Sequence, residues 1–287
     1  MSALKGPTLL FCPADRPDRY AKAAARADSI VLDLEDAVAP ADKDGARQSV
    51  VRALLELDPA HTFVRINALD TPWGKDDLAA LPAHTMVMLP KAGSAADVRA
   101  CAPRAVLALC ETAAGVLAAE SLARTDNCAG LMWGGEDLIA DLGGRSSRGP
   151  GGGYRGVVLH TRTQVLLAAT AAHKYAVDAV HLDISDLEGL AVEAEDAVAV
   201  GFRAKACIHP SHVAPIRAAF APTEAESRWA REVLAAAEIR GAVFRHGGRM
   251  VDAPVLAHAR SVLAALESAD DEPPSVAGNH TAHHTRK

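Results

Sequence analysis

Several acidic side chains stand directly after short apolar runs of this sequence. Glu111 follows "VLALC", and Glu136 with Asp137 follows "GLMWGG". Runs this short, rich in Val, Leu and Met, are typical of strands that are buried on both faces. An ionised acid is costly to bury unless it is paired, hydrogen-bonded or bound to a metal ion. Either these acids lie in loops that face water, or the strand ends gather them into a site.

The elements that would position these acids alternate along the chain. Short β-rich runs occur at 8–12, 29–34, 62–66, 85–90, 105–110, 130–133, 179–184 and 205–210. Ala-rich stretches with helical spacing separate most of them, including 42–57, 112–123, 159–176 and 186–201. About eight strand–helix units in about 210 residues predict an α/β fold, a (β/α)8 TIM barrel with a closed parallel sheet.

In a parallel barrel the carboxyl ends of all strands open on one face, where barrel active sites lie. The polar residues expected at these ends are Asp15, Arg16, Asp33, Glu35, Asp36, Arg65, Asn67, Lys91, Glu111, Glu136, Asp137, Asp183 and His209. A single acid such as Asp36, Asp137 or Asp186 can instead be a helix cap or a first-turn acid. Several acids at one face repel one another and need a cation, Arg or Lys beside them. We therefore favour one charged active site.

Composition narrows the class of protein. The chain has 287 residues, of which 49% are hydrophobic and 23% charged, so it can bury a substantial core. Its net charge of −6 gives no electrostatic reason to expect nucleic acid. No apolar stretch approaches the roughly 20 residues of a membrane span, and the first residues do not form a signal peptide. The five cysteines have no CxxC spacing that would indicate a zinc site. We expect a cytoplasmic protein with no nucleic-acid or membrane partner.

We expect three parts in the chain. Residues 1–222 are predicted to form the TIM-barrel catalytic domain, and residues 223–267 a C-terminal helical extension or lid. Residues 268–287 are polar and Pro-bearing, which is typical of a disordered tail. The Gly-rich stretch 143–156 is predicted to be either a lid over the site or an idle flexible loop.

A set of motifs along residues 8–266 carries a family resemblance. The motifs include "FVRIN", "VMLPKA", "ALCETAAGV", "WGGEDLIADLG", "AVHLDISDLEGL", "GFRAKACIHPSHV" and "MVDAPVLAHA". Together and in this order they resemble the CitE-like proteins, relatives of the citrate lyase beta subunit in the HpcH/HpaI aldolase superfamily. The resemblance implies a TIM barrel that binds Mg²⁺, or Mn²⁺ in its place, through Glu111 and Asp137. Mg²⁺ prefers oxygen ligands and commonly takes one or two carboxylates, which agrees with this pair.

The resemblance also implies the reaction and its residues. It is the cleavage or formation of a carbon–carbon bond in a 3-hydroxyacyl-CoA, giving acetyl-CoA and a keto acid. Arg65 would hold the substrate oxygens, with Glu111 and Arg16 as further substrate contacts. Asp252 would move the proton from a neighbouring subunit of a homotrimer, with Glu35 and Asp36 as competitors for that role. Asp252 can equally be the N-cap of the helix that follows it.

Three functions stay open. The favoured one is a free-standing lyase that acts on a citramalyl-CoA, malyl-CoA or 3-hydroxy-3-methylglutaryl-CoA type of substrate. The second is a citrate lyase beta subunit that cleaves citryl carried on an acyl carrier protein within a complex. The third is a non-catalytic binding protein, which the intact Arg65, Glu111 and Asp137 disfavour.

Overall fold

The computed structural model describes residues 4–270, and the chain divides into two compact units, Met1–Phe220 and Ala221–Lys287. The first unit is a closed barrel of eight parallel strands in which β8 pairs with β1, so the predicted (β/α)8 barrel is confirmed. The strands are β1 (Thr8–Pro13), β2 (Ser29–Asp33), β3 (Thr62–Arg65), β4 (Met86–Leu89), β5 (Val106–Cys110), β6 (Cys128–Trp133), β7 (Tyr175–Asp178) and β8 (Ala204–Cys207).

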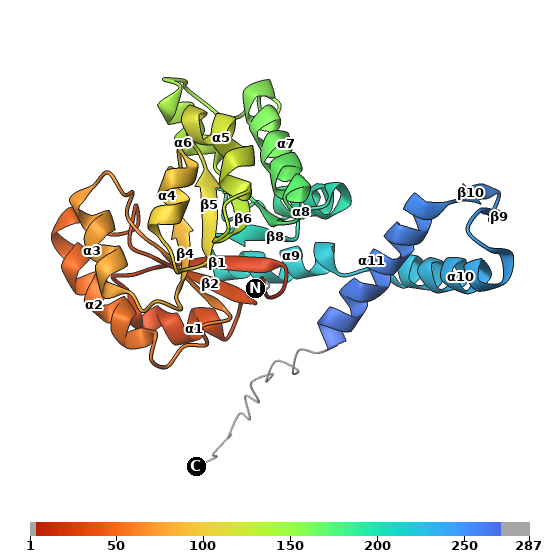
Figure 1. Ribbon diagram of the computed structural model, residues 1–287, viewed down its shortest axis with the longest axis horizontal. Coiled ribbons are helices and arrows are strands. Elements are labelled where there is room, and N and C mark those ends of the chain that lie inside the picture. The colour runs from red at the N-terminus through yellow and green to blue at the C-terminus, as the bar shows by residue number, and fades with distance from the viewer. Residues whose placement is uncertain (1–3, 271–287) are drawn as a thin grey trace, which may run out of the picture. The chain divides into compact units, whose positions relative to one another are not determined.

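Helices surround the barrel strands (Figure 1). They are α1 (Tyr20–Ala24), α2 (Lys43–Ala53), α3 (Pro72–Ala80), α4 (Ala95–Ala100), α5 (Ala113–Ala123), α6 (Gly135–Asp141), α7 (Gly156–Ala171), α8 (Leu187–Val200) and α9 (Val213–Phe220), with short 3-10 turns η1 (Pro17–Arg19), η2 (Pro40–Asp42) and η3 (Pro210–His212). Several begin at a capping side chain soon after a strand. Thr112 accepts a hydrogen bond from the Gly115 N–H, and Asp186 accepts one from the Gly189 N–H. Asp186 is therefore the N-cap of α8.

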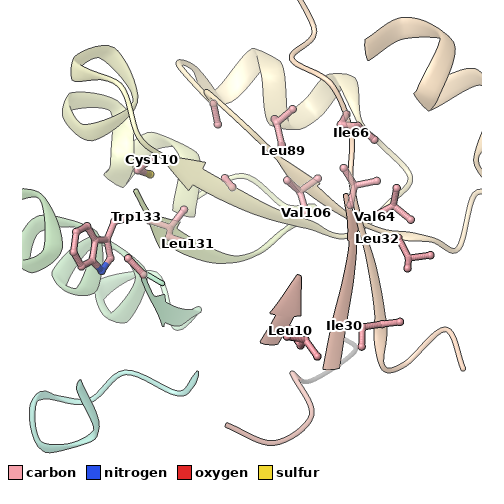
Figure 2. Close-up of a cluster of buried hydrophobic side chains, with 14 of the residues drawn as sticks. Leu10, Ile30, Leu32, Val64, Ile66, Leu89, Val106, Cys110, Leu131 and Trp133 are labelled. Carbon is pink, nitrogen blue, oxygen red and sulfur yellow. The ribbon is translucent and has the colours of Figure 1, made fainter. Parts of the chain in front are cut away.

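Two apolar layers follow from the alternation of side chains along each strand. One set faces the barrel interior: Leu9, Val31, Phe63, Met86, Met88, Leu107, Leu109, Met132, Val177, Ala204 and Ala206. The other set packs against the helices, and Figure 2 shows part of it, including Leu10, Ile30, Val64 and Trp133. Because successive residues point to opposite faces, a position two residues beyond an interior residue also points inward. This rule decides which polar groups reach the open end of the barrel.

The seventh strand differs from its prediction. It is Tyr175–Asp178, whereas the residue pattern predicts the strand at 179–184 and the preceding helix as far as 176. Helix α7 ends at Ala171, and His173 has a positive φ of 56°, which stops the helix before the strand. Asp183 therefore lies in an exposed loop, where its carboxylate accepts hydrogen bonds from Ser185.

A buried network of charges joins β7 and β8 to the helices outside the barrel. Lys205 is 1% exposed, and its Nζ donates to Asp178 Oδ2 at 2.9 Å and to Glu193 Oε2 at 3.3 Å. Arg162 Nε donates to Asp178 Oδ1 at 2.9 Å. Burial alone would raise the pKa of Asp178, but Lys205 and Arg162 outweigh it and hold that pKa below its usual range. Each charge in this network has an opposite charge beside it.

The second unit has its own elements and apolar cluster. It comprises α10 (Glu224–Arg240), the antiparallel pair β9 (Phe244–His246) and β10 (Arg249–Val251), and α11 (Ala253–Asp270). Ala230, Val233, Val251, Leu256, Ala259 and Val262 form the cluster. The predicted roles of these parts as catalytic domain and lid stay predictions. Residues 271–287, most of the predicted tail, lie outside the described residues.

Across residues 4–270, the structure contains no helix that is both long enough and apolar enough to cross a membrane.

The buried network gives a prediction about stability. Removing one member of a buried ion pair leaves the other charge uncompensated, which typically costs about 3–5 kcal/mol. We expect Lys205→Met to lower the free energy of unfolding by about that amount, measured by urea denaturation. Arg124→Met is the matched control, because Arg124 pairs with Glu120 on the surface, with side chains 63% and 69% exposed. If both variants unfold at the same urea concentration, the buried network is not a stabilising element.

Candidate functional site

Three charged residues point into the open end of the barrel because of strand alternation. Asp33, Arg65 and Glu111 each lie two positions beyond an interior residue, namely Val31, Phe63 and Leu109. We call this end the mouth, since the carboxyl ends of all eight strands lie there. Asp33 and Arg65 are partners in the register of β2 and β3.

Arg65 is held by a fork of hydrogen bonds. Its Nε and Nη2 each donate at 2.7 Å to the two oxygens of Asp33, and Nη1 lies 3.0 Å from Glu35 Oε2. The Glu35 contact is one between charges rather than an aligned hydrogen bond. The guanidinium carbon also lies 5.0 Å from the centre of the Phe11 ring. Burial opposes the charge of Arg65, but Asp33 and Glu35 raise its pKa, so this guanidinium stays charged and fixed in orientation.

Lys91 is the second cation of the mouth. Its Nζ donates to Glu35 Oε1 at 2.5 Å and lies 3.7 Å from Asp137 Oδ1. Burial would lower the pKa of Lys91, but the hydrogen bond and charge of Glu35 raise it above its usual range. Burial raises the pKa of Glu35 in spite of Arg65 and Lys91. Among the described residues, the acids Asp33, Glu35, Glu111 and Asp137 of the mouth outnumber the two cations that contact them, Arg65 and Lys91.

Glu111 shows this imbalance most clearly. It is 2% exposed, and one oxygen accepts a hydrogen bond from the Lys91 N–H at 3.0 Å. Among the described residues, none donates a hydrogen bond to its second oxygen. Burial, with the nearby charges of Asp137 and Glu35, raises the pKa of Glu111 to about 8. A side chain at Gly134 would meet Glu111 Oε2 at 2.9 Å, so only glycine leaves room there.

Three further acids line the mouth. Asp137 lies in the first turn of α6 and is partly exposed, while Asp36 is exposed and 3.8 Å from Arg65 Nη1. Glu136 accepts a short hydrogen bond from the hydroxyl of the buried Ser147. The structure thus brings Asp36, Arg65, Glu111 and Asp137 together, as the sequence predicted. Their chemical roles stay predictions.

These residues line a cavity of about 370 Å³. Its polar side is formed by Asp33, Asp36, Arg65, Glu111, Glu136 and Asp137, and its apolar side by Phe11, Leu109, Met132, Trp133, Tyr154, Val180, Leu182 and Ile208. A ligand that carries one charged end and one apolar end would fit such a cavity.

The Gly-rich segment 143–156 is a compact turn at the edge of the cavity. Arg148 and Tyr154 pair across it, with the guanidinium 3.9 Å from the ring centre, and Tyr154 packs edge-on against Trp133. Arg148 also donates to Glu193 Oε1 at 2.6 Å. The segment is therefore tied to α8 at one side and to the cavity wall at the other.

Two predicted site residues lie elsewhere. Arg16 is 44% exposed, pairs with Asp18 at 3.1 Å and does not line the cavity. Asp252 belongs to the second unit, where its Oδ1 accepts a 3.4 Å hydrogen bond from the Val255 N–H at the start of α11. The capping interpretation of Asp252 therefore has a contact in its favour, and the catalytic interpretation stays a prediction.

Two residues that shape the site were not predicted from the sequence. Lys43 is 5% exposed, and its Nζ donates to the backbone oxygens of Leu34 and Glu35, which fixes the loop that carries Glu35. Tyr154 forms part of the cavity wall. Lys43 gives no signal in the sequence, because it stands among charged residues in an ordinary helix start. Tyr154 is the one aromatic residue in the Gly-rich stretch, which is a signal.

A TIM barrel that gathers charged residues at the carboxyl ends of its strands places them where the active sites of barrel enzymes lie. Residues 7–210 match the HpcH/HpaI aldolase/citrate lyase family, and the chain belongs to that family.

Known proteins resemble the chain over nearly its whole length. A citrate lyase subunit beta-like protein of Mycobacterium tuberculosis is 53% identical, over 93% of this chain and 98% of that protein. A crystal structure of CitE from M. tuberculosis in complex with magnesium, acetoacetate and coenzyme A is 52% identical, with a TM-score of 0.88 over 93% of this chain and 100% of that chain. A (3S)-malyl-CoA thioesterase of Cereibacter sphaeroides is 34% identical, over 91% of this chain and 94% of that protein.

The raised pKa of Glu111 predicts how stability depends on pH without divalent cations. The folded protein, with a Glu111 pKa of about 8 against the ordinary 4.5, keeps a proton that the unfolded chain loses between these pH values. The stability from this group is present below pH 4.5 and is lost as the pH rises through 8. We expect the free energy of unfolding in EDTA to fall over this window, and to fall less steeply for Glu111→Gln, measured by urea denaturation at several pH values. Equal slopes for both proteins would show that Glu111 titrates normally.

Proposed function

We propose that this protein is a Mg²⁺-dependent carbon–carbon lyase that cleaves or forms a 3-hydroxyacyl-CoA thioester. The products of cleavage are acetyl-CoA and a keto acid. The observation that carries the proposal is the meeting of Glu111 and Asp137 with the clamped Arg65 in one cavity. Membership of the aldolase/citrate lyase family and the resemblance to a CitE bound to magnesium, acetoacetate and coenzyme A support it.

Glu111 and Asp137 fit a hard divalent cation. Burial, and after it the charge of Asp137, raises the pKa of Glu111, and one oxygen of Glu111 accepts no hydrogen bond from the described residues. In residues 4–270, no group of three or more Asp, Glu, His or Cys is arranged to hold a metal ion. Two carboxylates, with water and substrate in the other positions, are a usual ligand set for Mg²⁺. When bound, the ion supplies a positive centre that polarises the substrate's oxygen.

Arg65 orients the oxygen-rich end of the substrate. Asp33 fixes the fork of its guanidinium, and Phe11 packs against it, so the group keeps one direction without substrate. Its Nη1 is the nitrogen nearest to Glu35 and Asp36 on the cavity side. A carboxylate of the substrate would compete with Asp36 for this nitrogen. Fixed donors of this kind stabilise developing negative charge without reorganising.

The proton at the 3-hydroxyl needs a base. When that proton leaves, the bond between C2 and C3 breaks, and the electrons go to the enolate of the acetyl thioester. The enolate then takes up a proton at C2, which gives acetyl-CoA, and the former C3 becomes the carbonyl carbon of the keto acid. We propose Asp252 of a neighbouring subunit in a homotrimer for this step, following the family resemblance. Asp36 in the same cavity is the alternative within one chain.

The function is tested by assaying purified protein with Mg²⁺ against citramalyl-CoA, malyl-CoA, 3-hydroxy-3-methylglutaryl-CoA and free citrate. We expect acetyl-CoA and a keto acid in equal amounts from at least one thioester. Activity should disappear in excess EDTA and return with Mg²⁺ or Mn²⁺. Release of free CoA with the hydroxy acid intact would instead indicate hydrolysis, the activity in the name of the C. sphaeroides relative. Full turnover in excess EDTA would show that the reaction needs no metal ion.

The roles of Arg65 and Asp252 are separable by mutation. Arg65→Lys keeps the charge but loses the fork, so we expect both weaker substrate binding and slower turnover. Asp252→Ala should lower kcat by about 10²–10⁴-fold with little change in KM, as for loss of an acid or base.

Mixing the two impaired proteins tests whether Asp252 acts across a subunit boundary. Mixed trimers would contain some sites with both residues intact, so part of the activity should return. Subunit exchange is followed by mass spectrometry of labelled chains. Exchange without recovered activity would show that Asp252 does not act in the neighbour's site.

A further inference from the structure

Lys91 contacts the acidic mouth in two separate ways. Its backbone N–H donates to Glu111 Oε1 at 3.0 Å, while its Nζ reaches Glu35 and lies 3.7 Å from Asp137 Oδ1. Lys91 also has a φ of 49°, one of two positive values among the described non-glycine residues. A side chain in this left-handed region costs free energy, and such residues cluster at functional sites. One residue thus touches both proposed metal ligands.

We propose that Lys91 sets the affinity of the mouth for its divalent cation, as an internal counter-ion that competes for Asp137. This inference rests on the metal site of the proposed function. The backbone N–H positions Glu111 for binding, and the ammonium opposes binding. Lys91 is thus a positioning residue whose two contacts act in opposite directions.

The charges at the mouth explain why the ammonium matters. Asp33 accepts two hydrogen bonds from Arg65, and Glu35 lies between Arg65 and Lys91. Within residues 4–270, Asp137 has a cation within 4.0 Å in Lys91, and Glu111 accepts a hydrogen bond from a backbone N–H alone. A dication held by Glu111 and Asp137 would therefore stand next to the ammonium. The repulsion between the dication and the ammonium weakens metal binding. It arises because the ammonium that neutralises Glu35 is held at a fixed place in the mouth.

Replacing the ammonium by an apolar group of similar length should strengthen metal binding. For Lys91→Met we expect the Kd for Mg²⁺ to fall on the order of tenfold, because a unit charge near a dication is removed and solvent screens part of the effect. Isothermal titration calorimetry with Mg²⁺ alone measures this at one pH and salt concentration. The rise in melting temperature on adding Mg²⁺ should also be larger than in the wild type.

Matched variants separate charge from packing. Lys91→Arg keeps the charge and should bind Mg²⁺ as the wild type does. Lys5→Met makes the same change in net charge at an exposed lysine just before β1, at the opposite end of the barrel, and should leave the Kd unchanged. Asp137→Asn should lose most of the binding. A residue that only supported the structure would weaken binding when changed, so the direction of the Lys91→Met effect is the deciding readout.

The outcomes distinguish this inference from the proposed function. Wild-type binding with an unchanged or higher Kd in Lys91→Met overturns the role of Lys91 and leaves the metal site standing. Equal tightening by Lys5→Met would assign the effect to net charge and also overturn it. Failure of the wild type to bind Mg²⁺ overturns both the metal site and this inference.

Discussion

Repulsion between carboxylates that are packed at one end of a barrel is the constraint on which the site depends. Asp33, Glu35 and Glu111 are each less than 10% exposed, so water screens them little. Arg65 and Lys91 supply the two positive charges that make this packing tolerable. The loop fixed by Lys43 places Glu35 between those cations, and Gly134 leaves space for Glu111. Burial, together with the charges of Asp137 and Glu35, raises the pKa of Glu111 to about 8.

The barrel creates this repulsion through its own geometry. Along each strand, every second residue points inward, and within the barrel these residues are apolar. At the carboxyl end of the strand, the next inward-pointing residue faces the mouth. Val31 and Asp33 differ by one such step, as do Leu109 and Glu111. The interior cluster thus aligns the charged groups on the same rigid strands that it stabilises. A site on such strands keeps its geometry better than one on loops.

The same alternation explains what the sequence could predict. The barrel, and the placing of Arg65 and Glu111, follow from short apolar runs that end in a charge. The seventh strand was predicted wrongly, because Tyr175–Asp178 is only four residues long and ends on a buried acid, while the next run is longer and more apolar. A contact between distant segments, such as that of Arg148 with Glu193, has no signature in a single sequence. Asp252 lies in the second unit, and a single sequence does not show whether a residue of one unit acts in a site of the other.

Two buried charge networks in this barrel show how a functional cluster differs from a structural one. Outside the strands, Asp178 faces both Lys205 and Arg162, and its pKa lies below the usual range because the cations outweigh burial. Inside the mouth, burial and the charges of Asp137 and Glu35 outweigh the charge of Lys91 and raise the pKa of Glu111 to about 8. The outer network is complete within the chain, so it holds β7 and β8 against the helices and needs no ligand. The acids of the mouth outnumber the cations beside them, so a bound cation would complete their charge balance. This is a physical reason to look for a cation there. Since Glu111 and Asp178 are both 2% exposed, charge balance rather than burial distinguishes the two acids.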